Sequence, residues 1–175
     1  RARSEDRLGA FEAELAQARA AALIADRGRL YLCQLLCDHL RLLPERDPHD
    51  RLLKMSLDLL DTPLDGVALA RFEMTLLDEL GFGLDLTSCA ATGTTEDLAY
   101  VSPRSGRAVS RLAGEPYRDK LLALPKCLAE RGNGDPEDLA AAFRLTGYFL
   151  NEHVWGLRRL DPPATRDRLV EMLTE

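Results

Sequence analysis

The stretch LYLCQLLCDHLRLL, residues 30–43, decides the fold class of this chain. Its apolar side chains and one histidine recur at intervals of three or four residues, at positions Leu32, Leu35, Leu36, His39, Leu40 and Leu43. Such positions share one broad face of an α-helix. A stripe this wide is typical of a helix buried in a bundle, and Pro44 and Pro48 predict where it ends.

Helical patterns continue beyond this stretch. Apolar residues at helical spacing, bounded by proline or glycine, predict four more helices, at about 50–60, 67–80, 135–155 and 163–173. Gly81 is expected to be a left-handed cap that ends the second of these. Asp135 and Pro136 are expected as the N-cap and first residue of the longest one.

Two segments have a different pattern. LAYV at 98–101 and RAVS at 107–110 flank PRSG at 103–106, where proline fixes φ for a turn and glycine permits positive φ. These residues predict a β-hairpin inserted in a mainly α chain. Near the amino end, alanine-rich residues 8–24 favour a helix by propensity, although alternating Phe11 and Leu15 also fit a strand.

The composition is that of an ordinary globular domain. The 175 residues are 46% hydrophobic and 30% charged, which excludes a disordered or low-complexity chain. Charged residues interrupt every apolar run before the roughly 18 residues of a membrane span, so no membrane is expected as a partner. Four scattered cysteines and the lack of a signal peptide favour the cytoplasm. Because the first residue is Arg1 and not Met, we expect a piece of a longer protein.

Charge is distributed unevenly along the chain, whose formal net charge is −6. Residues 55–101 contain one cation, Arg71, against nine acids, which gives −8. Residues 102–131 contain seven cations against three acids, which gives +4. Clustered arginine and lysine are typical of phosphate binding, but a solvated charged face is the more common meaning. Both interpretations remain open for the hairpin.

No arrangement of residues typical of catalysis is visible. Gly81 and Gly83 lack the following lysine and helix start of a phosphate-binding loop, so we interpret them as a helix stop. Cys33 and Cys37 lie one helical turn apart, but tetrahedral zinc needs two further ligands. We therefore interpret the two cysteines as small apolar side chains in a helix core.

Several motifs together resemble one known family. They are RFEM at 71–74, LGFGLDL at 80–86, SCAATG at 88–93, TEDLAYVSPRSGRAVS at 95–110 and LTGYFL at 145–150. On these residues the chain is similar to the RecO family of DNA repair proteins, over nearly its whole length.

The resemblance implies a division of the chain. The family has an amino-terminal OB-fold, a five-stranded barrel suited to single-stranded nucleic acid, followed by a helical domain with a zinc ribbon or its remnant. Residues 1–24 would then be the end of the barrel and its exit into the helices. Residues 25–175 would be the helical domain, with the hairpin insertion at about 86–117.

The resemblance also implies that the ribbon has lost its metal. Zinc-bearing relatives present Cys-x-x-Cys-Gly, a hairpin and a second Cys-x-x-Cys, which together hold one zinc ion. Cys89 matches the first ligand here, while Thr92, Ser110 and Ala113 stand at the other three. We expect no zinc and no other cofactor, and a hairpin held instead by the apolar residues Leu98, Tyr100, Val101 and Val109.

As a RecO-like protein the chain is expected to be non-enzymatic, cytoplasmic and associated with the nucleoid. It would bind single-stranded DNA, anneal complementary strands and, with RecR, help load the RecA recombinase onto DNA covered by single-stranded-DNA-binding protein. The competing hypotheses are a helical adaptor without DNA contact and a small hydrolase with an unrecognised site.

Two sets of candidate binding residues follow. For DNA they are the cations in and after the hairpin, Arg104, Arg107, Arg111, Arg118 and Lys120. The resemblance further implies that the helical domain receives the acidic, aromatic-ended tail of single-stranded-DNA-binding protein, whose terminal carboxylate suits an arginine. For this tail the candidates are Arg71 and Phe72, or the cations Arg41, Arg46, Arg51 and Lys54. The alternative is that Arg71 simply pairs with Glu73 or Asp78.

Overall fold

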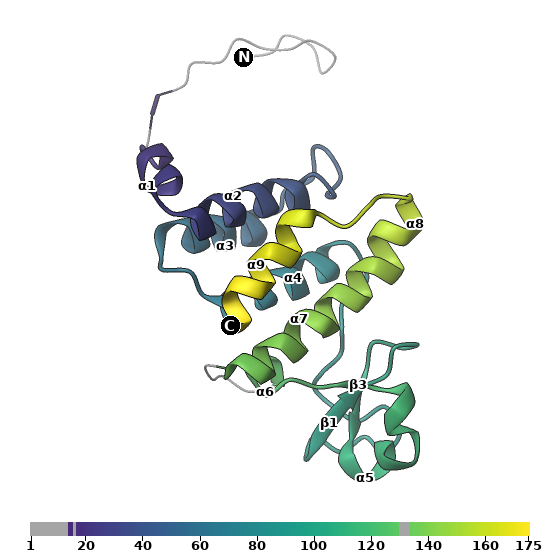
Figure 1. Ribbon diagram of the computed structural model, residues 1–175. Helices are drawn as coiled ribbons and strands as arrows, with labels where there is room; N and C mark the ends of the chain where they lie inside the picture. The colour runs from purple at the N-terminus through teal and green to yellow at the C-terminus, as the bar shows by residue number, and fades with distance from the viewer. Residues whose placement is uncertain (1–13, 16, 130–133) are drawn as a thin grey trace.

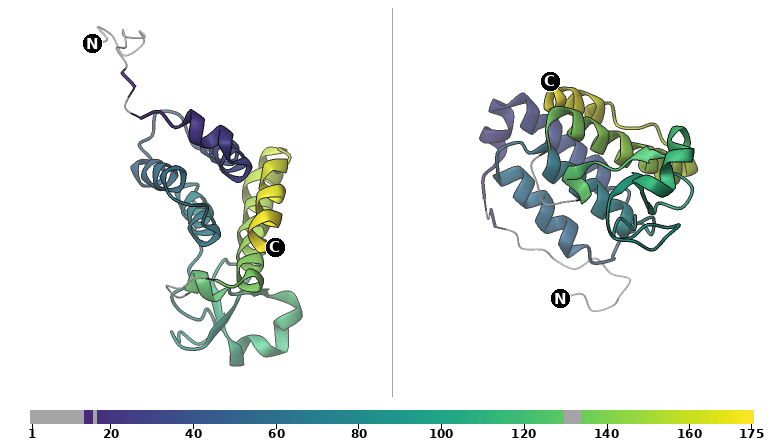
Figure 2. Two further views of the ribbon diagram at one scale, coloured as in Figure 1. Left: turned by 60° about the vertical axis from the view of Figure 1, so that its left-hand side comes forward. Right: turned by 90° about the horizontal axis from the view of Figure 1, so that it is seen from below.

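A helical bundle carries a small β-containing module at one end (Figure 1). The computed structural model describes residues 14–15, 17–129 and 134–175. The main helices are α2 (Arg27–Leu40), α3 (Asp50–Asp61), α4 (Gly66–Glu79), α7 (Pro136–Leu150) and α9 (Ala164–Thr174). Figure 2 shows α3 and α4 on one side of the bundle, α7 and α9 on the other, and α2 across the end away from the module.

The predicted helix at 30–43 is confirmed as α2, although it ends at Leu40. Asp26 caps its first turn by accepting a hydrogen bond from the Arg29 amide at 3.1 Å. The stripe found in the sequence faces inward, with Leu32, Leu35, Leu36 and His39 buried. The wide apolar face is covered because α9 packs along α2.

The helices predicted at 50–60 and 67–80 are also confirmed, as α3 and α4. The Asp65 carboxylate caps α4 through the amides of Val67 and Ala68, at 2.9 and 3.1 Å. Gly81 follows with φ +86°, the left-handed conformation that ends a helix. Helix α4 is the central element, since it contacts α3, α6 and α7.

The longest predicted helix changes from an α-helix to a π-helical turn near its end. Helix α7 begins as expected, with the Asp135 carboxylate accepting from the Asp138 amide at 2.8 Å. The backbone continues through a π-helical turn, Asn151–Trp155, into the short α8, Gly156–Arg158, and stops at Arg159 with φ +56°. Helix α9 confirms the last helix that the sequence predicts.

The hairpin is confirmed and is part of a larger module. Strands β1 (Leu98–Val101) and β2 (Ala108–Ser110) pair antiparallel, and Gly106 in the turn has φ +66°. A third strand, β3 (Leu122–Ala123), pairs with the other edge of β1. The sequence did not predict β3, nor the short helices around it, which are α5 (Arg111–Gly114), the 3-10 helix η1 (Glu115–Lys120) and α6 (Lys126–Ala129).

One hydrophobic core joins the bundle to the module. Its largest fully buried side chains include Phe72, Phe143 and Phe149. Val101 and Ala108 of the hairpin belong to the same core, so the hairpin is held by apolar packing against the helices. Tyr100, which was expected to pack on the bundle too, instead lies against α5 within the module.

The amino-terminal helix is shorter than the alanine-rich pattern suggests. Within the described residues, the helix α1 covers Ala20–Ala25, and residues 14–15 and 17–19 are not helical. The alternative of a barrel strand falls mostly on residues 1–13 and 16, outside the described part of the chain.

The centre of the bundle contains a buried carboxylate, which the sequence did not reveal. Glu73 of α4 is fully buried, and Arg166 of α9 holds it with two hydrogen bonds, Nε to Oε1 at 2.7 Å and Nη2 to Oε2 at 2.9 Å. The Thr146 hydroxyl of α7 donates to Oε2. His39 Nε2 of α2 lies 3.3 Å from Oε1, at ion-pair distance but outside hydrogen-bond geometry. Four helices therefore meet at one carboxylate.

The partners of Glu73 keep it charged. Burial alone would raise the pKa of the Glu73 carboxyl, but the charge and the hydrogen bonds of Arg166, with His39 nearby, lower it below its usual range. A glutamate in an unfolded chain has a pKa of about 4.3. The stability that ionised Glu73 contributes is therefore fully present above that pH and is lost as pH falls further toward the lowered pKa.

We expect Arg166→Met to destabilise the fold by about 3–5 kcal/mol at neutral pH, because it leaves a buried carboxylate without its main partner. Urea denaturation would measure this loss. The penalty should shrink under acidic conditions, where protonation neutralises the unpaired Glu73. Arg168→Met, an exposed position on the same helix, is the matched control and should cost far less. A loss in Arg166→Met no larger than in the control would contradict the role of the cluster.

Candidate functional site

A groove of about 650 Å³ lies between α3, α4 and α6. Two arginines and several apolar side chains line it: Arg51, Met55, Arg71, Met74, Thr75, Leu128 and Ala129. Methionines pack against ligands of different shapes because their side chains are unbranched and flexible. The groove thus combines positive charge with an adaptable apolar wall.

Arg71 stands where this groove meets a second one. The neighbouring cavity, about 530 Å³, lies between α3 and the start of α4 and is lined by Met55, Asp58, Leu59, Thr62, Pro63, Leu64, Asp65, Ala68 and Arg71. The Arg71 Nη2 atom donates to the Cys127 carbonyl of α6 at 2.8 Å. This bond fixes the guanidinium at the boundary between the two grooves.

The position of α6 is itself fixed from α7. The Asp138 carboxylate accepts hydrogen bonds from the amides of Lys126 and Cys127, at 2.7 and 2.8 Å. These amides belong to the first turn of α6, which has no helical partners for them. Asp138 therefore anchors the carbonyl that Arg71 contacts, and the wall of the groove is tied to the bundle.

The structure places the predicted tail-binding cations at different sites on the surface. Arg51 joins Arg71 in the groove, while Arg41 lines a different hollow on α2, and Arg46 lies in the exposed loop before α3. Lys54 is exposed on α3 but does not line the groove.

Phe72 needs correction as a candidate for binding the tail. Its side chain is 0% exposed and belongs to the core of the bundle. The ring therefore has no surface to offer a partner. The apolar contacts of the groove come instead from Met55, Met74 and Leu128, which the sequence analysis did not select.

The alternative that Arg71 pairs with Glu73 or Asp78 is wrong, because these two acids have other partners. Glu73 is held in the core by Arg166. Asp78 lies 3.9 Å from Arg51, and both of these side chains are exposed, so this pair is weak.

In the module, two candidate DNA-binding arginines pair with acids from the preceding acidic stretch. Arg107 Nε donates to Asp85 Oδ2 at 3.2 Å, and Arg111 Nε donates to Asp97 Oδ1 at 3.2 Å. All four side chains are well exposed, so each pair contributes little to stability and can exchange for another partner.

The other three cations are exposed around the module. Arg118 lies 3.6 Å from both Glu115 and Asp119, again in open solvent. Within the described part of the chain, Arg104 and Lys120 have no ion-pair partner. Arg104 lies in the hairpin turn, whereas Arg111 follows β2 at the opposite end of the hairpin, so the five cations do not form a single cluster.

Cys89, Thr92 and Ser110, three of the four positions that the resemblance matches to ribbon zinc ligands, lie close together. The buried Cys89 Sγ accepts a hydrogen bond from the Ser110 amide at 3.2 Å. Burial alone would raise the pKa of the Cys89 thiol, but hydrogen bonds from Ser110 and Thr92 lower it to about 6. Hydrogen bonds thus connect Cys89, Thr92 and Ser110 at the base of the hairpin.

The remaining cysteines do not complete a metal site. No group of three or more His, Cys, Asp or Glu in the described residues is arranged to hold a metal ion. Cys33 and Cys37 lie one turn apart on α2, but Cys33 is only half-buried and Cys37 is exposed, so the prediction that both lie in a helix core is wrong. Burial raises the pKa of the Cys33 thiol. Burial and Asp138 raise the pKa of the Cys127 thiol to about 12, which disfavours the thiolate that a metal needs.

Comparison with known proteins decides the family. Residues 24–160 match the family described as Recombination protein O C terminal. The chain belongs to the RecO family. It is 52% identical over 173 residues to the DNA repair protein RecO of Mesorhizobium japonicum, a match that covers 95% of this chain and 68% of that protein.

Other RecO proteins are equally similar. Those of Rhizobium etli and Agrobacterium fabrum are both 51% identical over 177 aligned positions, which cover 98% of this chain and 69% and 70% of the two relatives. No solved structure gives a significant match. Family membership supports a role in DNA repair and recombination. None of the described helices has the length and apolar character needed to cross a membrane.

We expect the purified chain to contain no stoichiometric zinc, because Thr92, Ser110 and Ala113 stand at positions where the family resemblance implies three of the four ligands of a zinc ribbon. Elemental analysis after expression with added zinc would measure this. Cys89→Ser is the control and should leave the metal content unchanged. About one zinc per chain that resists a mild chelator would contradict the prediction and would implicate Cys33, Cys37 or Cys127.

Proposed function

We propose that this RecO chain is a non-enzymatic recombination mediator. In this role it binds single-stranded DNA and repair partners, anneals complementary strands and helps load the RecA recombinase. The observation that carries the proposal is the groove in which Arg51 and Arg71 border an apolar wall. The relatives named as DNA repair proteins support the same process.

The proposed occupant of the groove is the tail of single-stranded-DNA-binding protein. An acidic peptide that ends in an aromatic residue and a free carboxylate needs a cation beside an apolar pocket. Arg71 offers a planar guanidinium at the boundary of two cavities, and the methionines offer a surface for the ring. Residues 55–101, which include most of the groove, carry a net charge of −8. Arg51 and Arg71 are the cations that line the groove, so they would fix where the terminal carboxylate of the peptide binds.

The proposed DNA contact lies on the module. Arg104 and Lys120 are exposed, and the ion pairs of Arg107, Arg111 and Arg118 are weak enough for phosphate to compete with the acids. Such contacts hold the nucleic acid backbone without reading its sequence. The proposed RecR contact rests on family membership alone.

The second candidate function, a helical adaptor without DNA contact, is favoured by one observation. Local acids already neutralise three of the five cations on the module. An adaptor would bind the tail peptide and show no affinity for an oligonucleotide at low salt. A titration with the oligonucleotide therefore distinguishes the two candidate functions.

We expect Arg71→Ala to weaken binding of the tail peptide by about 1.5–3 kcal/mol, the range for hydrogen bonds to charged groups. Calorimetry with the peptide would measure it, and Arg71→Lys should give a smaller loss because lysine keeps the charge without the planar fork. Arg41→Ala is the matched control, because Arg41 lines another hollow. Undiminished affinity in Arg71→Ala, with unchanged thermal stability, would remove the tail from this groove.

We expect replacement of Arg104, Arg107 and Arg111 by alanine to flatten the salt dependence of oligonucleotide binding. Each lost contact with single-stranded DNA should reduce the slope of log K against log salt by about 0.7. Fluorescence anisotropy at several salt concentrations would measure the slope. A control that replaces Arg27, Arg41 and Arg168, which are exposed on or next to α2 and on α9, removes the same charge. Equal slopes in both triple variants would show that the hairpin is only a solvated face.

A further inference from the structure

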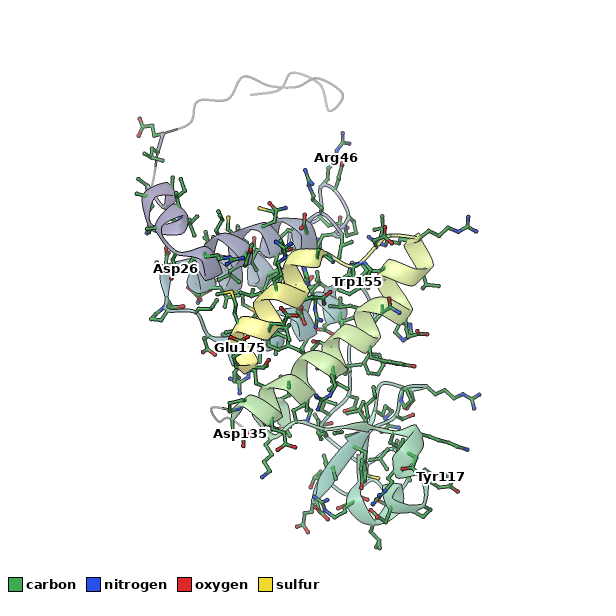
Figure 3. All side chains as sticks on the ribbon, viewed as in Figure 1. Asp26, Arg46, Tyr117, Asp135, Trp155 and Glu175 are labelled. Atoms are coloured by element: carbon green, nitrogen blue, oxygen red, sulfur yellow. The ribbon has the colours of Figure 1, made fainter. Side chains whose placement is uncertain are left out.

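The module exposes two large apolar side chains. Leu112 of α5 is 88% exposed and Tyr117 of η1 is 62% exposed. Figure 3 shows Tyr117 on the edge of the module that lies away from the helical bundle. An aromatic ring left this open offers one face and an edge to a ligand.

The turn that carries Tyr117 is held in place. Gly114, just before η1, packs so closely on Tyr100 of β1 that a Cβ at this position would collide with the ring. The Tyr100 hydroxyl donates to Glu115 Oε2 at 3.0 Å. Packing and a hydrogen bond thus tie the turn to the sheet, and Tyr117 projects from a fixed support.

Cations flank the exposed ring within the same short helix. Arg118 follows Tyr117 directly, and Lys120 lies three residues beyond it. Arg118 is 3.6 Å from Glu115 and Asp119, a distance at which exposed pairs are weak. The exposed ring of Tyr117 therefore lies next in sequence to a cation whose ion pairs are weak enough to exchange for another partner.

We propose that Tyr117 is a stacking platform for one base of a single-stranded nucleic acid, with Arg118 and Lys120 contacting the adjacent phosphates. The inference rests on the proposed DNA function and goes further, because it assigns a base contact to a residue outside the cationic set. Aromatic rings stack on any base, so the contact would not depend on sequence. In a duplex the bases are already stacked and paired, so the platform favours single strands.

The test uses two oligonucleotides and a series of variants. Affinity for oligo-dT and for an abasic strand of equal length would be measured by anisotropy at one low salt concentration. We expect Tyr117→Leu to weaken oligo-dT binding by about 5- to 150-fold, and Tyr117→Phe to keep most of the affinity. The same substitutions should leave binding to the abasic strand unchanged. Leu112→Ala, in the same module, is the control for loss of exposed apolar surface.

The salt dependence gives an independent readout. Because stacking releases no counterions, the slope of log K against log salt should be the same in Tyr117→Leu and in the unchanged chain. Replacing Lys120 with alanine should reduce the slope instead.

The outcomes separate this inference from the function on which it rests. If the unchanged chain does not bind oligo-dT at all, the proposed DNA contact fails and the stacking role fails with it. If the chain binds and Tyr117→Leu binds equally well, only the stacking role is overturned. Equal losses on oligo-dT and on the abasic strand would also overturn it, because the ring would then act without a base.

Discussion

The fold depends on one buried carboxylate. Glu73 of α4 takes two hydrogen bonds from Arg166 of α9, one from Thr146 of α7, and lies at ion-pair distance from His39 of α2. A charge without water must be matched by its neighbours, so these helices are constrained to meet at one point. Apolar packing alone would stabilise many arrangements of leucine-rich helices, whereas the carboxylate is satisfied in one.

The surfaces proposed for binding are formed by, or packed against, the helices that meet at this carboxylate. Another face of α4 carries Arg71 and Met74 into the groove, and Asp138 of α7 fixes the α6 carbonyl that Arg71 contacts. Val101 and Ala108 extend the same core into the module. The proposed peptide and nucleic acid sites would thus lie on parts of the chain that share one hydrophobic core.

Local signals in the sequence predicted the main helices, the hairpin and the cap at Asp135, because periodicity and turn residues act over a few positions. The same signals missed β3, whose two residues form a strand only beside β1. The family resemblance, and not these local signals, placed Phe72 at a binding surface, and Glu73 was considered only as a surface partner of Arg71, whereas both side chains are buried. Glu73 and Arg166 are 93 residues apart, so only the folded chain reveals their pairing.

The most direct test of this description is hydrogen exchange of Glu73→Leu compared with the unchanged chain. If one carboxylate joins the four helices into a cooperative unit, the most protected amides of α2, α4, α7 and α9 should lose protection by the same amount. The result that would contradict it is a loss confined to α4, with α2 and α9 protected as before. The bundle would then be held by apolar packing, and the buried charges would be incidental to its assembly.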